Sequence, residues 1–423
     1  MLIRGGHLVD PVQRLDALLD VRLAGGVVAQ IGEHLEAEDG ETVVDAAGAY
    51  VAPGFIDMHV HLREPGQPEK ETIATGIAAA VAGGFTAVAC MPNTQPAIDT
   101  PEIVARVLRG ARDAAGARVW PIAAITRGRH GTQTLDYAAL RAAGAVAFSD
   151  DGNTVMDARV LREAALAARE TGCAFISHCE DELLKGDAVM NEGSASRALG
   201  VSGSPGVAED AIVARDLLLA LDTGMRWHIA HVSTRGALDV LRWMRARGLA
   251  ATCEVTPHHL YLTDEEIRTL GSGAKVNPPL RAAPDARALC DAVRDGTIDV
   301  FATDHAPHAQ AEKSAPLDCG AVGFSSLEVA LGAYALAVPD LPVARYVELL
   351  SVNPARILGV PGGTLRVGAQ ADVTVFADRQ WIVDPSTFVS KGKSTPFAGK
   401  RLPRRAVATI VGGELAYRVV SSG

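Results

Sequence analysis

Two histidines separated by one residue, His59 and His61, are the first side chains in this sequence whose types and spacing could do chemistry. If residues 54–62 form a strand, positions i and i+2 point to the same face, so both imidazoles can reach one metal ion. Imidazole nitrogen is a common zinc ligand. Two half-buried histidines of an ordinary strand would have the same spacing, so the pair alone leaves both interpretations open.

Four more side chains of metal-binding type each follow a short apolar run further along the chain. A lone histidine in such a place is more often a hydrogen-bonded core residue than a ligand. A buried aspartate without a cation nearby would be costly, which favours a metal partner. The four residues are Asp151, His178, His231 and Asp304.

Eight apolar segments alternate with Ala- and Leu-rich stretches of helical periodicity that often end in glycine. Strands alternating with helices predict a parallel sheet, and eight such units predict an α/β fold, the (β/α)₈ TIM barrel. In that fold the C-terminal ends of the strands meet at one rim. The six histidines and aspartates are therefore predicted to share one cavity. The segments are 54–62, 85–93, 118–126, 145–152, 174–181, 226–233, 250–259 and 298–308.

The two ends of the chain have a different pattern: short segments of alternating apolar and polar residues, typical of strands, separated by glycine turns. Chain ends often lie close together in space. We therefore predict a small β-sandwich domain built from both termini, with residues 1–51 and 361–423 flanking a barrel of residues 52–360.

Composition excludes several classes of protein. The formal net charge of the 423 residues is −10 and there is no long basic run, which argues against nucleic acid or an anionic membrane as a partner. The six cysteines form no CxxC pair, which is typical of reduced thiols. No signal peptide and no run of about 18 apolar residues is found. We expect a cytoplasmic protein.

The sequence around the histidine pair resembles the opening motif of the amidohydrolase superfamily. Residues 53–61 read PGFIDMHVH, and the REPG that continues at residues 63–66 is typical of dihydroorotases and hydantoinases. The similarity extends along nearly the whole chain and is strongest to class I dihydroorotases. It includes MPNT at 91–94, TPHH at 256–259, NPPLR at 277–281 and SKGKSTPFAG at 390–399.

This resemblance implies a zinc enzyme that reversibly hydrolyses the cyclic amide of L-dihydroorotate to N-carbamoyl-L-aspartate in pyrimidine biosynthesis. It implies two zinc ions per subunit, with Asp304 also acting as the catalytic acid and base. Many superfamily members bridge the ions with a carboxylated lysine, but residues 145–152 contain none. The implied bridge is Asp151, and Asp150 is the alternative turn residue. The implied ligands are His59, His61, Asp151 and Asp304 for one ion, and Asp151, His178 and His231 for the other.

The resemblance also implies a site for the substrate. Arg63, Asn93 and His308 correspond to residues around the dihydroorotate carboxylate, and Asn277 to a residue that holds the ring. The fork of an arginine suits a carboxylate. Relatives usually have Pro-Phe-Gly where this chain has Ala321, Val322 and Gly323. Since the contacts of Val322 and Gly323 with the ring are expected from the backbone, the departure puts affinity in doubt more than reaction type.

Two other functions compete with this interpretation. A hydantoinase or allantoinase would share the barrel and the histidine pair, but Asp151 and the set of Arg63, Asn93 and His308 favour a dihydroorotase. A catalytically dead scaffold for aspartate carbamoyltransferase would have lost metal ligands, whereas all six are present here. We expect a homo-oligomer, and a complex of the live enzyme with aspartate carbamoyltransferase stays open.

Overall fold

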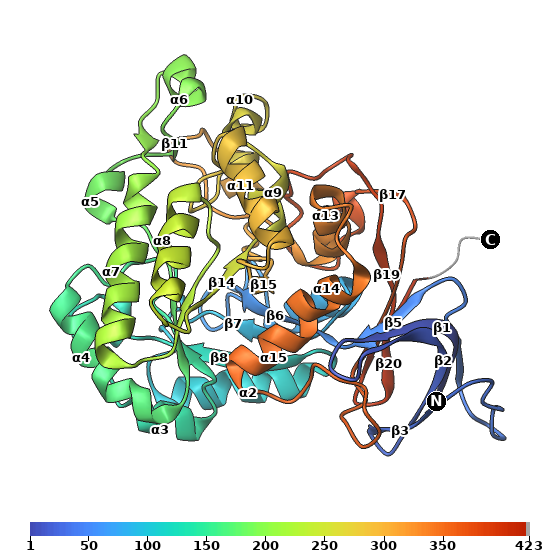
Figure 1. The fold of residues 1–423 in the computed structure, drawn as a ribbon. Coiled ribbons are helices and arrows are strands. Elements are labelled where there is room, and N and C mark those ends of the chain that lie inside the picture. The colour runs from blue at the N-terminus through green and yellow to red at the C-terminus, as the bar shows by residue number, and fades with distance from the viewer. Residues whose placement is uncertain (420–423) are drawn as a thin grey trace.

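Eight parallel strands form the central barrel in the computed structural model, which describes residues 1–419 (Figure 1). They are hydrogen-bonded in chain order, and a parallel bridge between Val60 and His305 joins the first strand to the segment after the last. Each lies within one of the eight predicted segments, so the predicted barrel is confirmed. The strands are β6 (Phe55–Val60), β7 (Phe85–Cys90), β8 (Arg118–Ala123), β9 (Ala147–Phe148), β10 (Ala174–Ser177), β13 (Trp227–Ile229), β14 (Thr252–Val255) and β15 (Val300–Phe301).

Helices surround the barrel, and the amphipathic ones bury one face against it. In α2 (Pro101–Ala114), for example, Val104 and Val107 are buried, and in α8 (Arg235–Ala246) Leu238 and Leu241 are buried. The longer helices are α1 (Ile73–Ala82), α2 (Pro101–Ala114), α3 (Tyr137–Ala143), α4 (Ala158–Ala168), α7 (Val207–Thr223), α8 (Arg235–Ala246), α11 (Ala283–Arg294) and α13 (Ala330–Ala337). Within residues 1–419, no helix is both long and apolar enough to cross a membrane.

Short elements fill connections within the barrel and in the C-terminal part of the chain. The short helices are α5 (Glu182–Lys185), α6 (Ser194–Leu199), α9 (Pro257–Tyr261), α10 (Ile267–Leu270), α12 (Gln310–Lys313), α14 (Val343–Val347) and α15 (Asn353–Leu358). The paired short strands are β11 (Met190–Asn191) with β12 (Gly203–Ser204), and β17 (Trp381–Ile382) with β18 (Arg401–Leu402).

A register shift in the first barrel strand decides where its histidines point. Ile56 and Met58 belong to an apolar cluster that contains residues of the other barrel strands, whereas Val60 packs in a larger cluster that also contains many helix residues. The pairing of β6 with β7 shifts between Asp57 and Val60, and such bulges re-aim side chains. His59 and His61 therefore face the interior.

Strands from both chain ends form one mixed sheet beside the barrel, where the blue and red ribbons meet in Figure 1. Its strands pack around a common apolar core that includes Ile3, Val21, Val51, Val373 and Ile410. The predicted boundary at residues 51 and 52 falls inside β5 (Tyr50–Pro53), and the domain limits stay predictions. The strands are β1 (Leu2–Asp10), β2 (Leu15–Ala24), β3 (Val27–Gly32), β4 (Val43–Asp45), β5 (Tyr50–Pro53), β16 (Val373–Ala377), β19 (Arg405–Val411) and β20 (Glu414–Arg418).

Residues 388–394, which we name the strap, leave this sheet and lie against loops of the barrel. Glu328 accepts hydrogen bonds from the main-chain nitrogens of Val389 and Ser390. The main-chain nitrogen of Ser325 donates to the oxygen of Ser394 at 2.8 Å, and its hydroxyl donates to the oxygen of Gly392 at 2.8 Å. The strap therefore braces the loop that follows the last barrel strand.

Candidate functional site

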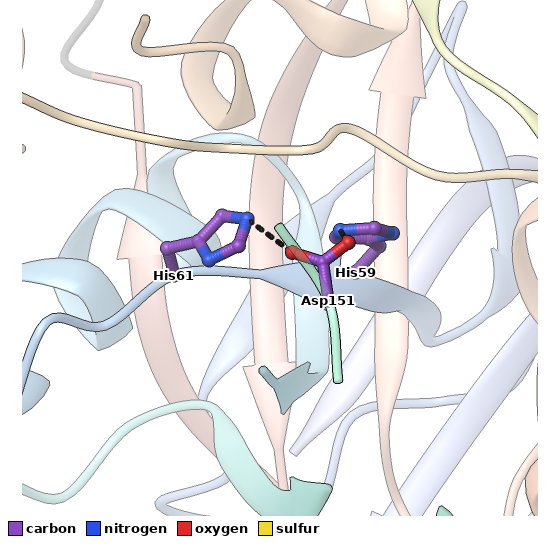
Figure 2. A group of neighbouring side chains, drawn as sticks. All are labelled: His59, His61 and Asp151. Carbon is purple, nitrogen blue, oxygen red and sulfur yellow. Dashed lines mark ion pairs between the residues drawn. The ribbon is translucent and has the colours of Figure 1, made fainter. Parts of the chain in front are cut away.

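Three side chains at the ends of two barrel strands form the first group of possible metal ligands (Figure 2). His59 lies in β6, His61 directly follows that strand, and Asp151 follows β9. Nε2 of His59 lies 3.3 Å from Oδ1 of Asp151, and Nε2 of His61 lies 3.6 Å from its Oδ2. All three residues are buried. The two carboxylate oxygens of Asp151 thus face different histidines.

Asp151 also belongs to a second group, with His178 and His231. Its Oδ1 lies 3.7 Å from Nδ1 of His178 and 3.5 Å from Nε2 of His231, and these two nitrogens are 3.1 Å apart. Asp304 lies beside the first group, with Oδ1 3.0 Å from Nε2 of His61 and 3.6 Å from Nε2 of His59. The six residues predicted as ligands are therefore brought together, and Asp151 is shared.

The spacing of these atoms fits zinc. Two nitrogen or oxygen ligands, each about 2.0–2.1 Å from a tetrahedral ion, lie roughly 3.3 Å from one another. The distances above run from 3.0 to 3.7 Å. Nε2 of His59 and Oδ1 of Asp151 are buried and have no hydrogen-bond partner among residues 1–419. Buried polar atoms are normally paired, so an ion is the partner that this geometry calls for.

The electrostatics of the group point the same way. Burial would lower the pKa of His59, but the carboxylates of Asp151 and Glu254 raise it well above its ordinary value. Burial would raise the pKa of Asp151, yet the positive charge of His59 and the nearby imidazoles of His178 and His231 hold it well below its usual range. Burial likewise opposes ionisation of Asp304, and the hydrogen bond from His61 and the charges of His59, His61 and His231 lower its pKa. The ionised carboxylates of Asp151 and Asp304 thus favour a cation between these side chains.

Three of the four histidines have their second ring nitrogen held by another side chain. Nδ1 of His59 lies 2.6 Å from Oε1 of Glu254, Nδ1 of His61 lies 2.7 Å from Oδ1 of Asn93, and Nε2 of His178 lies 3.0 Å from Oε2 of Glu180. Such partners fix which nitrogen carries the proton and how the ring is turned. Glu254 and Glu180 were not predicted from the sequence as site residues. Glu254 carried a signal, because it is a charged residue inside the apolar run of β14.

The backbone at three site residues adopts a conformation that side chains rarely take. The φ angles are 60° at Arg63, 31° at His231 and 45° at Asp304. Non-glycine residues with positive φ are uncommon and concentrate at functional sites. β13 and β15 end before His231 and Asp304. These strands are shorter than the predicted segments because the chain turns there to aim the ligand side chains.

Asp57 links the two strands that flank the site. Its Oδ1 accepts hydrogen bonds from the main-chain nitrogens of His59 and Thr303, both at 3.1 Å. It is fully buried, and this desolvation raises its pKa to about 7 despite the hydrogen bonds. Asp57 thus fixes the backbone next to His59 and Asp304.

A cavity of about 270 Å³ opens above these residues. All of the predicted substrate-binding residues line it, together with five of the six predicted ligands; His59 lies deeper. A volume of this size suits a small molecule. The substrate-binding residues concerned are Arg63, Asn93, Asn277, His308, Val322 and Gly323.

Arg63 is the cationic group of this cavity, and it is only 7% exposed. Its Nε donates to the oxygen of Pro307 at 3.2 Å, and one terminal nitrogen lies 3.1 Å from Nε2 of His308. Burial lowers the pKa of Arg63 to about 10, so the guanidinium stays charged near neutral pH. Burial and the charges of Arg63 and Lys70 lower the pKa of His308 to about 3, so the imidazole is neutral.

Glycine is required at residue 323. Its φ is 108°, and a Cβ there would lie 2.5 Å from Cβ of Ala306. Nε2 of His308 also lies 2.8 Å from the oxygen of Val322. The loop that departs from the family sequence at Ala321 and Val322 is therefore tied to the cavity wall through backbone atoms.

Two polar residues near the site have structural contacts. Oδ1 of Asp150 accepts from the main-chain nitrogens of Ile125 and Thr126, which gives this residue the turn role that was its alternative. His259 lies 2.9 Å from the oxygen of Pro278 and 2.8 Å from the hydroxyl of Thr256. These contacts give His259 a structural role.

Comparisons with known proteins give a consistent result. Residues 48–237 match the family described as dihydro-orotase-like. Proteins named dihydroorotase from Anaeromyxobacter dehalogenans and Pelotomaculum thermopropionicum are 47% identical to this chain, and each alignment covers 99% of this chain and 98% of the relative. The dihydroorotase of Citrifermentans bemidjiense is 46% identical, with 99% of both chains covered.

Solved structures support the fold. The L-hydantoinase of Arthrobacter aurescens superposes with a TM-score of 0.87 at 24% identity, covering 99% of this chain and 97% of that one. The D-hydantoinase of a Thermus species gives 0.84 at 24% identity, covering 99% and 96%. At this level of identity the likeness speaks for the barrel and the adjoining β-domain alone.

Proposed function

This chain belongs to the dihydroorotase family of cyclic amidohydrolases, and on that premise we propose that it is itself a zinc-dependent dihydroorotase. It would interconvert L-dihydroorotate and N-carbamoyl-L-aspartate in pyrimidine biosynthesis. One observation carries the proposal: a buried arginine, Arg63, lines the same small cavity as the two groups that share Asp151. A cyclic amide that bears a carboxylate matches this site, because its amide could react at the metal groups while its carboxylate binds Arg63.

The residues assigned to the metals are the two groups described above. His59, His61, Asp151 and Asp304 would hold one zinc ion, and Asp151, His178 and His231 the other. When bound, zinc lowers the pKa of a coordinated water from 15.7 toward about 7 and polarises a carbonyl group. The bridge assigned to Asp151 needs no modified lysine.

Asp304 is assigned to proton transfer. Its carboxylate takes a proton from water as the new C–O bond forms at the amide carbon. The same group returns that proton to the ring nitrogen as the C–N bond breaks, so atoms and charge balance. In the reverse direction the roles are exchanged, which suits a reversible reaction. The position of Asp304, 3.0 Å from His61 at the cavity floor, supports this assignment.

Arg63, Asn93 and His308 are assigned to the substrate carboxylate. Nε of Arg63 donates to Pro307 and one terminal nitrogen lies beside His308, which leaves the other terminal nitrogen for the ligand. The Oδ1 atom of Asn93 faces His61, so its Nδ2 donor is available to the carboxylate. Since the carboxylate is charged throughout the reaction, these contacts bind substrate and transition state alike.

The cellular setting completes the proposal. The six cysteines form no disulfide in the part of the chain described, which agrees with a cytoplasmic enzyme. Its partner is the small-molecule substrate. A homo-oligomer, with or without aspartate carbamoyltransferase, is retained from the sequence as a proposal.

The test is ring opening of L-dihydroorotate, assayed beside hydantoin and allantoin, with zinc content measured on the same preparation. We expect turnover of dihydroorotate in preference to the other two and close to two zinc ions per chain. Preferred turnover of hydantoin or allantoin would contradict the proposed substrate while leaving the family intact.

A further inference from the structure

A line of polar contacts runs from the metal group to the far wall of the cavity. It starts at His178, passes through Glu180 and Lys185, and ends at Asn277. We name these four residues the relay. Two of them, Glu180 and Lys185, have no role in the function proposed above.

Glu180 is the buried centre of the relay, with 1% of its surface exposed. Its Oε2 lies 3.0 Å from Nε2 of His178 and 2.6 Å from Nζ of Lys185. One carboxylate oxygen thus joins a predicted metal ligand to a lysine.

Lys185 is held in place by its own element. It ends the short helix α5, in which the side chain of Asp181 caps the main-chain nitrogens of Leu183 and Leu184. Its side chain is 19% exposed and reaches inward. The ammonium group has three donors and no acceptor, so any atom that it contacts closely must be an acceptor.

That constraint fixes the amide of Asn277. The contacts are satisfied when the amide oxygen accepts from Nζ of Lys185 at 2.6 Å and the amide nitrogen donates to the oxygen of Val276 at 3.0 Å. An asparagine amide has two N–H donors, so one remains. Because Asn277 lines the cavity, that donor is available to a ligand there.

We propose that Lys185 is a positioning residue for substrate recognition: it locks Asn277 so that the amide offers an N–H, and not its oxygen, to the substrate. The matching substrate atom is an acceptor, such as a ring carbonyl oxygen of a cyclic ureide. Glu180 holds Lys185 in this position and orients His178 at the same time. The identity of the substrate rests on the proposed function. The orientation of the Asn277 amide by Lys185 rests on the contacts alone.

Kinetics of Lys185→Met test the role in recognition. Without the ammonium, the amide can turn its oxygen toward the substrate, so KM should rise roughly 3- to 10-fold, the worth of one hydrogen bond, while kcat stays near wild type. Lys185→Arg keeps a cationic donor and should recover part of the loss. Lys400→Met is the matched control, because the amine of Lys400 lies over the ring of Tyr261 instead, and it should leave KM unchanged.

A double-mutant cycle with Asn277→Ala decides whether Lys185 acts through that residue. If it does, Lys185→Met should have no further effect on KM in the Asn277→Ala background. An equal rise of KM in both backgrounds, or no rise in either, would overturn the proposal. Zinc content is measured for every variant so that KM values are compared at equal metal loading.

The same cycle on the metal-free protein separates this inference from the proposed function. Thermal midpoints of wild type, the two single variants and the double variant need no substrate. Non-additive midpoints support the contact between Lys185 and Asn277 even if wild type fails to open dihydroorotate, and then only the function is wrong. Additive changes in the thermal midpoint would refute the contact between Lys185 and Asn277, whatever the substrate is.

Discussion

The carboxylate of Glu254 lies 2.6 Å from Nδ1 of His59, and both side chains are fully buried. The pair fixes the proton on Nδ1 and leaves Nε2 directed at Asp151. The other oxygen of Glu254 lies 3.2 Å from Nε2 of His228, so one carboxylate supports two imidazoles.

Glu254→Gln should therefore weaken zinc binding. Neutral glutamine is a poorer acceptor for the His59 proton, and loss of such a supporting partner typically costs about 10- to 100-fold in metal affinity. Competition with a chromophoric zinc chelator measures the change. Glu265→Gln, at a half-exposed glutamate, is the control and should bind zinc as wild type does. Equal affinity in both variants would remove Glu254 from the site.

Two adjacent aspartates should respond differently to the same change. Asp151→Asn removes a charge that both metal groups share, so zinc content and activity should fall together. Asp150→Asn alters a turn, where the carboxylate accepts from Ile125 and Thr126, so the thermal midpoint should fall while zinc per folded chain is retained. Bicarbonate should not affect wild-type activity, because no carboxylated lysine is needed. Full zinc content in Asp151→Asn would refute the bridge.

Arg63→Ala should act mainly on KM. A charge-assisted contact with a carboxylate is worth about 1.5–3 kcal/mol, or roughly 10- to 150-fold. Because the carboxylate is charged in ground and transition states, the loss belongs in KM rather than kcat. Arg63→Lys keeps the positive charge but loses the planar guanidinium donors, so its KM should lie between those of wild type and Arg63→Ala. Steady-state kinetics on dihydroorotate with all three proteins give the comparison, and an unchanged KM would mean that the carboxylate is bound elsewhere.

Glu328 should make the stability of the protein depend on pH. Burial raises its pKa to about 7, although hydrogen bonds from Val389 and Ser390 and the charge of Lys393 oppose the shift. A carboxyl group with a raised folded-state pKa contributes stability that is complete below its unfolded value of about 4.3 and is lost as pH rises through 7. Relative to Glu328→Gln, the wild-type thermal midpoint should thus decline between pH 5 and 8. A constant difference between the two midpoints would show that Glu328 is ionised throughout.

The sequence was sufficient to predict the barrel, because each apolar segment ends in a polar residue and the alternation with helices is regular. It also predicted the six candidate ligands, because residues at the C-terminal ends of barrel strands all meet at one rim. It could not predict the register shift in β6, since alternation by itself does not say which face a bulge will turn inward. Glu180 and Lys185 were missed because their role depends on a contact with Asn277, which is distant in the chain.

The strap also has a consequence for biosynthesis. A chain grows from its N-terminus, and early parts fold before later parts exist. All eight barrel strands precede residue 302, but the loop at Ser325 is braced only once Gly392 and Ser394 have left the ribosome. A nascent chain released before residues 388–394 are synthesised would contain every candidate metal ligand, but the loop at Ser325 beside the cavity would lack its support. Such a fragment should take up zinc yet bind substrate weakly, so loading with metal can precede competence for substrate during synthesis.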